Sequence, residues 1–251
     1  MSGAITIRKC EMLEDFHACV ALQRDIWGEQ DLEVEPSTMF VVASHTGGQV
    51  LGAYDGRNLV GYTLAVAALR NGAPYLHSHM TGVHANYRDR GVGRMLKLFQ
   101  RDEALSRDIR LIEWTFDPLE MRNAHFNLNR LGAVIREYAV NFYGTDYGKD
   151  AAEHVGGLPG MDSDRLFASW ELNSSRVQAL SERREVSVGK PDDVIEISND
   201  FGALVKSDPA AAKVEALRIR KEFLRAFAAG LVCRAFERDE QRPRYLLYKE
   251  G

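Results

Sequence analysis

The sequence has few cysteines, and none of them are spaced as metal ligands or as a disulfide framework. The three cysteines, Cys10, Cys19 and Cys233, are odd in number and widely separated, which predicts reduced, structural thiols. His77 and His79 lack Asp, Glu, Cys or further His residues close by in sequence that would complete a ligand set. We therefore expect no metal.

Long apolar runs and a basic charge balance are also missing. Residues 1–8 lack the apolar core of a signal peptide, and no apolar run approaches the length that spans a bilayer. The net charge is −4, whereas nucleic-acid binding generally relies on an extended basic surface. These absences predict a cytoplasmic protein with neither a membrane nor a nucleic acid as partner.

The 251 residues, 45% of them hydrophobic, can fill a folded core. A stretch rich in Gly, Asp and His over residues 144–164 interrupts the hydrophobic pattern, as a mobile loop or lid does. We therefore expect two domains, residues 1–145 and 146–251. The second is predicted to contain strands at 165–172 and 194–197, a helix capped by Ser207-Asp208-Pro209 and closed by Gly230, and a final hairpin over 231–236 and 245–248.

The most informative stretch is Arg88-Asp89-Arg90-Gly91-Val92-Gly93, between a predicted strand and an amphipathic helix. Two glycines within three residues let main-chain N–H groups turn toward a ligand, and the helix start adds unpaired N–H groups and a positive dipole end. This combination predicts a pyrophosphate cradle. A P-loop and a dinucleotide fingerprint are excluded, because no Lys-Ser or Lys-Thr follows the glycines and the third glycine is missing.

The elements on either side of the cradle have clear patterns. In the preceding strand, residues 74–83, alternation places Leu76, Ser78 and Met80 on one face and His77, His79, Thr81 and Val83 on the other. In the following helix the wheel groups Met95, Leu96, Leu98, Phe99 and Leu105, with Arg94, Lys97, Arg101, Asp102 and Arg107 largely elsewhere.

The motif Arg-x-x-Gly-x-Gly between a strand and a long helix resembles motif A of the GNAT superfamily of acyl-CoA-dependent N-acyltransferases. The order of elements is similar to that family over about residues 4–145: strand 4–9, helix 14–27, hairpin strands 50–54 and 59–68, strand 110–116, helix 119–131 ending at Gly132, and strand 133–142. The run from Glu113 to Pro118, with Arg122, Asn123, Ala124 and Asn127, resembles an uncharacterised branch of the superfamily.

The resemblance implies an α+β fold, a mixed but mostly antiparallel sheet flanked by helices, with a smaller C-terminal α+β region. That region echoes the strand, helix, strand, strand order of the second half of the first domain. It is either a degenerate half-copy or a family-specific extension that covers the acceptor site or forms a dimer contact. The sequence leaves open whether the protein forms a homodimer.

The resemblance also implies the activity, transfer of an acyl group from CoA to a primary amine of a small molecule by direct attack on the thioester. Acetyl-CoA is the default donor and succinyl-CoA the alternative; an amino acid is one class of acceptor, whose carboxylate Arg122 or Arg165 could meet. In the family, pantetheine enters between the strand before the cradle and the strand after its helix. The residues this assigns to the acyl-CoA are Thr81, Gly82 and Val83 for pantetheine and Arg88, Arg90, Gly91, Val92, Gly93 and Arg94 for the pyrophosphate. Asn123 and Asn127 could jointly meet a carboxylate or an amide of the substrate or of pantetheine.

The candidate bases are His79, His77 and Glu113. Histidine accepts a proton near neutrality, although two histidines at i and i+2 also suit a hydrogen-bonded pair in a half-buried sheet. Glu113 lies among apolar residues and is therefore either a base or half of a structural pair. Asp117 is a fourth candidate base, although its favoured role is to cap the next helix.

One departure from the family concerns the leaving thiolate. Many members place a tyrosine four residues before the glycine that ends this helix, and that position is Leu128 here. Water, Tyr143 or a tail residue then supplies the proton, or the protein is a non-catalytic acyl-CoA-binding or assembly module. The asparagine early in the helix also shifts, from the expected Met121 to Asn123.

Overall fold

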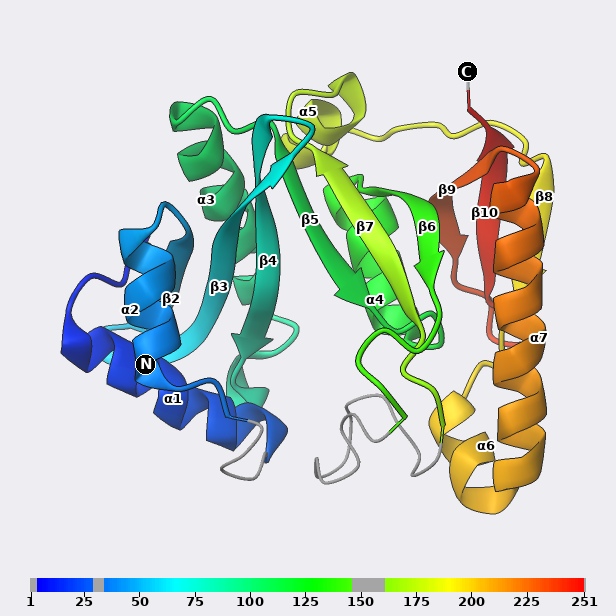
Figure 1. The fold of residues 1–251 in the computed structure, drawn as a ribbon, viewed down its shortest axis with the longest axis horizontal. Helices are drawn as coiled ribbons and strands as arrows, with labels where there is room; N and C mark the ends of the chain where they lie inside the picture. Colours follow the sequence, from blue (N-terminus) through cyan, green and yellow to red (C-terminus); the bar gives the residue numbers. More distant parts are fainter. Residues whose placement is uncertain (1–3, 29–33, 146–160, 251) are drawn as a thin grey trace. The chain divides into compact units, whose positions relative to one another are not determined.

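The computed structural model describes residues 4–28, 34–145 and 161–250 (Figure 1). The chain divides into two units between Glu113 and Trp114, within strand β5 (Leu111–Phe116). The domains expected at 1–145 and 146–251 stay a prediction, and most of the proposed loop or lid over 144–164 lies outside the described residues.

The first unit has the strand order β1-β2-β3-β4-β5, antiparallel except for the parallel pair β4 and β5. Its elements before β5 are β1 (Ile5–Lys9), α1 (Leu13–Trp27), α2 (Ser37–His45), β2 (Gln49–Asp55), β3 (Asn58–Arg70), β4 (Ala73–Val83), the 3-10 helix η1 (Ala85–Tyr87) and α3 (Val92–Ser106). The strands expected at 4–9 and 74–83, the helix at 14–27 and the hairpin over 50–68 are confirmed.

Helix α2 is absent from the sequence predictions for a physical reason. Its sequence, Ser-Thr-Met-Phe-Val-Val-Ala-Ser-His, is rich in residues that favour strands, and its start has no side-chain cap. Phe40 and Ala43 are buried in it, so tertiary packing rather than propensity holds this helix.

Two hydrophobic clusters lie on opposite faces of the first unit's sheet. Phe40, Tyr62 and Leu64 belong to the cluster under α1 and α2, and Leu51 and Leu96 to the cluster under α3. Successive strand residues alternate between these faces, as the pleat requires. The sheet is therefore covered by α1 and α2 on one side and by α3 on the other.

The second unit has the strand order β5-β7-β6-β9-β10-β8. Its elements after β5 are α4 (Met121–His125), the π-helix η2 (Phe126–Leu131), β6 (Val134–Ala139), β7 (Arg165–Glu171), α5 (Ser175–Ser181), β8 (Asp193–Glu196), α6 (Phe201–Ser207), α7 (Pro209–Ala228), β9 (Leu231–Glu237) and β10 (Arg244–Lys249). The expected strands at 165–172 and 194–197 and the final hairpin are confirmed, and the strand expected at 133–142 already ends at Ala139. Together the two units give the α+β class, a mostly antiparallel sheet flanked by helices, that the sequence predicts.

The helix expected over 119–131 is shorter and changes type. Only Met121–His125 is α-helical, and a π-helical stretch follows up to Gly132, which has a φ of 82°. The Trp170 indole donates to the carbonyl of Leu131 at 2.7 Å, and the Arg176 guanidinium donates to that of Leu128 at 2.9 Å. Donors from β7 and α5 thus satisfy the carbonyls of a wider turn, which local periodicity does not reveal.

The C-terminal tail, from β8 to β10 (residues 193–249), repeats the topology of the segment before it. Segments β5, α4, β6, β7 give the strand order β5-β7-β6, and β8, α7, β9, β10 give β8-β10-β9. Strands β6 and β9 join the two sets through an antiparallel pair, Ile135 with Cys233. This arrangement supports the interpretation of the tail as a degenerate half-copy.

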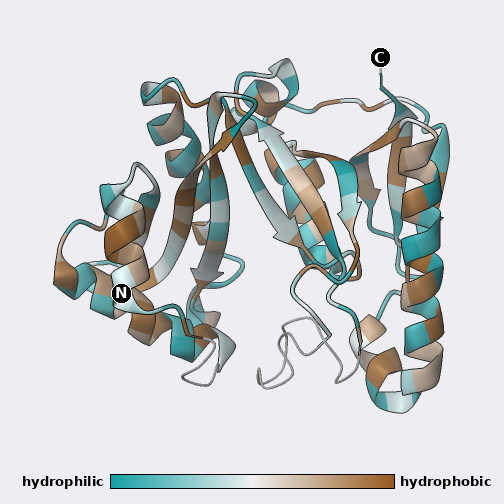
Figure 2. Cartoon of the chain, in the orientation of Figure 1, coloured by the Kyte–Doolittle hydropathy of each residue, from teal (hydrophilic) through white to brown (hydrophobic). Residues whose placement is uncertain are grey.

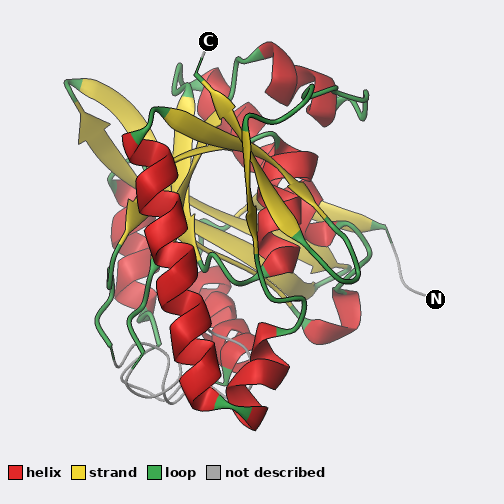
Figure 3. Cartoon of the chain, turned by 90° about the vertical axis from the view of Figure 1, so that its right-hand side faces the viewer, coloured by secondary structure: helices red, strands yellow, loops and turns green. Residues whose placement is uncertain are grey.

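Helix α7 covers strands of the second unit (Figure 3). Its N-cap, Asp208, accepts a hydrogen bond from the Ala211 amide at 2.9 Å, and Pro209 occupies the first turn, as the sequence predicts. Hydrophobic and hydrophilic residues alternate along the helix (Figure 2). The buried ones are Ala212, Ile219, Phe223 and Ala226.

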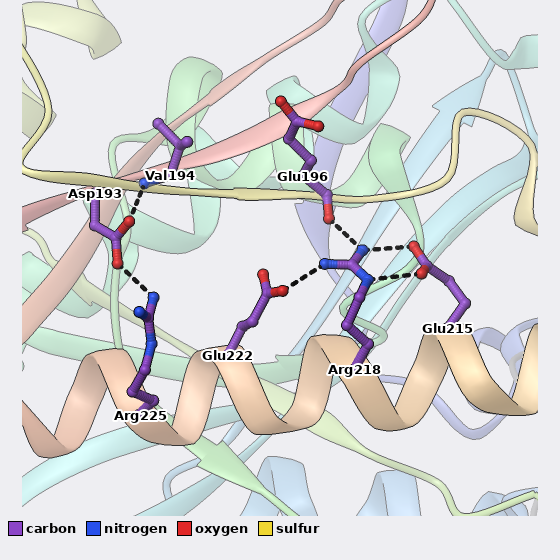
Figure 4. A network of polar contacts seen from close by, with 7 residues as sticks. All are labelled: Asp193, Val194, Glu196, Glu215, Arg218, Glu222 and Arg225. Atoms are coloured by element: carbon purple, nitrogen blue, oxygen red, sulfur yellow. Dashed lines mark hydrogen bonds and ion pairs between the residues drawn. The ribbon is translucent and has the colours of Figure 1, made fainter.

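The polar side of α7 holds strand β8 (Figure 4). Arg218 donates to Glu215, to Glu222 and to the carbonyl of Glu196, and Arg225 pairs with Asp193 at 2.7 Å. Both arginines are thus engaged by carboxylates, so we assign this network to stability rather than to ligand binding.

Candidate functional site

The cradle between β4 and α3 has the geometry that the sequence predicts. Gly91 has a φ of 79° and is the N-cap of α3. The α-helical ladder begins with the Met95 amide donating to the Gly91 carbonyl at 3.0 Å, so within this helix the amides of Val92 and Gly93 have no acceptor. A Cβ built on Gly91 meets no described atom within 4 Å. At this helix start Gly91 is exposed, Val92 is buried and Gly93 is half-buried, and the first turn contains no acidic residue.

Two exposed arginines precede this helix start. The Arg90 guanidinium lies 5.0 Å from the centre of the Tyr87 ring, and the Tyr87 hydroxyl donates to Asp55 at 2.9 Å. Arg88 Nε donates to the carbonyl of Val83 at 3.4 Å. Positive charge therefore lies beside the N-terminus of α3, a combination that suits a phosphate.

A β-bulge in β4 corrects the predicted strand faces. The pairing runs from Leu64 with Met80 directly to Ala65 with Ser78, which leaves His79 as the extra residue. Ser78 consequently contacts α3, whereas Met80 packs with the cluster under α1 and α2. The alternation expected for this strand is therefore wrong beyond Ser78, and Val83 packs with the α3 cluster.

Beyond the bulge, β4 offers backbone groups at one edge. Strand β5 pairs with β4 at Leu76–Ile112 and His77–Glu113, and in the described residues the rest of β4 pairs only with β3. The His84 amide donates to the Val60 carbonyl at 2.9 Å, so by antiparallel alternation the backbone N–H and C=O groups of Thr81 and Val83 point away from β3.

Gly82 has a packing role. A Cβ there would lie 2.6 Å from the Trp27 ring and 2.8 Å from Ile26, so close approach of α1 requires glycine.

His79 makes a charge-assisted contact that sequence reasoning misses. Its Nε2 lies 2.8 Å from Oε1 of Glu35. The His79 side chain is 30% exposed and the Glu35 side chain 29%. This hydrogen bond lowers the pKa of Glu35 below its ordinary value. A carboxylate bound to one ring nitrogen orients the imidazole and leaves Nδ1 for a proton from substrate. Glu35 lies 44 residues before His79, so no local motif could have indicated it.

Glu113 and His77 lie beside each other in the parallel pairing of β4 and β5. Glu113 is 3% exposed and forms an ion pair with Arg70 at 2.6 Å. Burial, and next the neighbouring His79, lower the pKa of His77, which favours the neutral imidazole. The structural pair stated as one alternative for Glu113 is therefore present.

Helix α3 presents a different face to the sheet than its apolar pattern predicts. Lys97 is buried and Met95 is 38% exposed, which reverses the prediction for both residues. Lys97 Nζ donates to Ser78 Oγ at 2.8 Å and to the Gln100 side-chain oxygen at 3.0 Å. These hydrogen bonds allow the polar side chains to be buried, because each one offsets part of the free-energy cost of desolvation.

The second unit contains the remaining predicted residues. Asn127 is buried in η2, whereas Asn123 is exposed on α4, so the expectation that both face one ligand stays untested. Asp117 accepts a hydrogen bond from the Leu119 amide at 2.8 Å. This is a turn contact just before α4, whose own N-cap is Glu120.

Leu128, at the family's tyrosine position, is fully buried. The Tyr143 hydroxyl lies 3.0 Å from that of Thr115, and the Arg165 guanidinium lies 5.3 Å from the Tyr143 ring.

The described residues were also searched for metal-binding groups, for helices that could span a membrane and for disulfides. Among the described residues, no group of three or more His, Cys, Asp or Glu side chains could hold a metal ion. In the same part of the chain, each helix is too short or too polar to cross a membrane. The three cysteines are free and buried.

Comparisons with known proteins show which solved structures share this fold. No protein-family model matches the chain, and no curated protein matches its sequence. Among solved structures, the chain is similar to the ribosomal-protein-S18-alanine N-acetyltransferase of Escherichia coli, with a TM-score of 0.53 and 12% identity over 68% of this chain and 96% of that one. A protein assigned to the GNAT family from Desulfovibrio desulfuricans matches with a TM-score of 0.51 and 13% identity over 67% and 99%.

Arabidopsis thaliana Naa50, solved in complex with the bisubstrate analogue CoA-Ac-MVNAL, matches with a TM-score of 0.50 and 15% identity over 66% of this chain and 97% of its own. Identities this low establish the fold and nothing further. The chain has a GNAT-like fold.

Proposed function

We propose that this protein is an acyl-CoA-dependent N-acyltransferase, with acetyl as the default acyl group and a small-molecule primary amine as acceptor. The observation that carries the proposal is the start of α3 at Gly91, where the space around Gly91 is open and the exposed Arg88 and Arg90 lie just before it in sequence. In a GNAT-like fold this feature suits the pyrophosphate of CoA. The backbone groups of Thr81 and the amide of Val83, whose carbonyl accepts from Arg88, suit the two amide groups of pantetheine.

The reaction requires a neutral amine, a polarised thioester carbonyl and a protonated leaving thiolate. We propose that His79 takes the proton from the attacking amine through Nδ1, while Glu35 fixes its ring. Glu113 is a weaker candidate for the base, because its carboxylate is paired with Arg70.

Binding and turnover test the proposal directly. Titration calorimetry with CoA, acetyl-CoA and succinyl-CoA measures affinity, and a thiol reagent follows CoA release in the presence of a panel of primary amines. We expect measurable affinity and amine-dependent thiol release. Absence of both would remove the proposal.

A charge placed at Gly91 tests the cradle. Gly91→Asp should fold, because Asp is a good N-cap, tolerates positive φ better than most residues, and meets no described atom within 4 Å. Its carboxylate would repel a pyrophosphate, so we expect CoA affinity to fall by at least about 100-fold, which is about 2.7 kcal/mol. Gly91→Asn, with the same shape and no charge, is the matched control and should bind more tightly than Gly91→Asp. Equal affinity of the two variants would contradict the cradle.

The His79–Glu35 pair gives a second prediction. His79→Gln should lower kcat about 100-fold, because general-base catalysis typically contributes that much, and Glu35→Gln should lower it less. His17→Gln, an exposed histidine on α1, is the control. Steady-state kinetics on the acceptor found in the panel is the measurement, and unchanged kcat in His79→Gln would assign the base elsewhere.

Leu128 supports a second candidate, an acyl-CoA-binding module without turnover. A buried leucine stands where many family members have a hydroxyl. This alternative predicts CoA affinity with no thiol release for any amine, and no response of that affinity to His79→Gln.

A further inference from the structure

Lys97 is a buried amine that the proposed chemistry leaves unassigned. It is 4% exposed in the middle of α3, and its Nζ lies 2.8 Å from Ser78 Oγ and 3.0 Å from the side-chain oxygen of Gln100. Ser78 is itself 4% exposed. Burial lowers the pKa of Lys97 to about 7 from an ordinary value of 10.5, so the ammonium can release and regain a proton near neutrality.

The position of Ser78 on β4 connects this pair to the proposed acyl-CoA site. Ser78 is the first residue of β4 beyond its last pair with β5, His77 with Glu113. Val83, at the cradle end of β4, is five residues further on, a distance of about 16 Å at roughly 3.3 Å per residue. An extended pantetheine arm that starts at Gly91 and follows this edge would bring its sulfur toward Ser78.

Resting on the acyltransferase function proposed above, we propose that Ser78 and Lys97 form a proton relay that protonates the thiolate leaving group. The amine nitrogen forms a bond to the acyl carbon, and the carbon–sulfur bond breaks with its electron pair on sulfur. The Ser78 hydroxyl gives its proton to sulfur and receives one from the Lys97 ammonium, which becomes neutral. The proton lost by the amine passes through His79 to solvent, and Lys97 regains one from solvent, so charge and protons balance.

The relay replaces the hydroxyl that the family's tyrosine would provide at Leu128. It also predicts a pH dependence, because only the charged form of Lys97 can donate. His77 on β4 interacts electrostatically with Lys97, and His79, Glu113 and Arg70 interact in turn with His77. The rate should therefore fall as pH rises above about 7.

The decisive variants are Lys97→Met and Ser78→Ala. Lys97→Met keeps a side chain of similar length without charge, and Gln100 Nε2 already lies 3.4 Å from Ser78 Oγ, so the cluster keeps a hydrogen bond. We expect each variant to lower kcat by about 100-fold, the lower range for general acid catalysis, with CoA affinity by calorimetry unchanged. The double variant should be no slower than either single variant, because the two residues act as one unit.

The alkaline fall in kcat should disappear in Lys97→Met. An exposed lysine changed in the same way, Lys206→Met, is the control for loss of a positive charge. Wild-type kcat in Lys97→Met, or an alkaline limb that persists in it, would overturn the relay and leave the acyltransferase proposal standing. Loss of CoA affinity that accounts for the whole loss of rate would also overturn it. A wild-type protein that binds no acyl-CoA and releases no thiol would overturn both proposals.

Discussion

At the scale of the residue, buried Lys97 couples stability to pH. Its pKa is about 7 in the folded protein and 10.5 ordinarily, so between these values the unfolded chain binds a proton that the folded chain does not. This contribution to stability therefore increases with pH from about 7 to about 10.5 and is constant below and above that window.

We predict that Lys97→Met removes this dependence. The unfolding free energy of the wild type should rise relative to that of the variant as pH rises, by up to about 1.4 kcal/mol per pH unit inside the window. Urea unfolding of both proteins at a series of pH values measures it. A difference that stays constant from pH 6 to pH 10 would show that Lys97 keeps its ordinary pKa.

Residue-scale geometry also shows where pattern reasoning succeeds. Gly91 and Gly132 both have positive φ values and both end or begin a helix, as their places in the sequence predict. The burial of Lys97 is unpredictable from a helical wheel, since it depends on a hydroxyl at Ser78 that reaches α3 from another element.

At the scale of the element, the bulge in β4 determines which face of the sheet each side chain of the strand lies on. A single extra residue, His79, shifts the alternation. Ser78 and Met80, which a regular strand would place on one face of the sheet, therefore lie on opposite faces. Strand periodicity predicts the existence and length of β4 but not the insertion, because an extra residue leaves no compositional mark.

Helix α7 gives an element-scale prediction. Asp208 caps its N-terminus through the Ala211 amide, so Asp208→Ala should lower the unfolding free energy by about 1 kcal/mol. Asp208→Asn keeps a capping oxygen and should be close to the wild type, which separates capping from charge. Chemical denaturation monitored by circular dichroism is the measurement, and equal losses in both variants would argue against the cap.

At the scale of the whole molecule, the tail is part of the second unit's structure. Its residues reach the earlier part of that unit through the Phe236 amide, which donates to Asn129 at 2.9 Å, and the Tyr245 hydroxyl, which donates to the Pro118 carbonyl at 2.7 Å. Strand β9 also pairs with β6. The tail therefore satisfies backbone and side-chain groups that would otherwise face water.

We predict that a chain truncated after Asn173 self-associates. Removal of β9 exposes the edge of β6, and an unpaired strand edge favours pairing with another chain. Size-exclusion chromatography with light scattering compares the truncated chain with the full one. A truncated chain of monomeric mass that unfolds as cooperatively as the full chain would show that the tail is dispensable for folding.

The sequence alone determined most of the strands and helices, the cradle at Gly91 and the GNAT-like order of elements, because these follow from periodicity, turn residues and local backbone freedom. Tertiary structure decided the pairing of His79 with Glu35 and of Glu113 with Arg70, the burial of Lys97 against Ser78, and the π-helical turn held by Trp170 and Arg176. Each of these contacts joins residues far apart in the chain, and the energies of burial and hydrogen bonding that select them exist only once the strands and helices have packed.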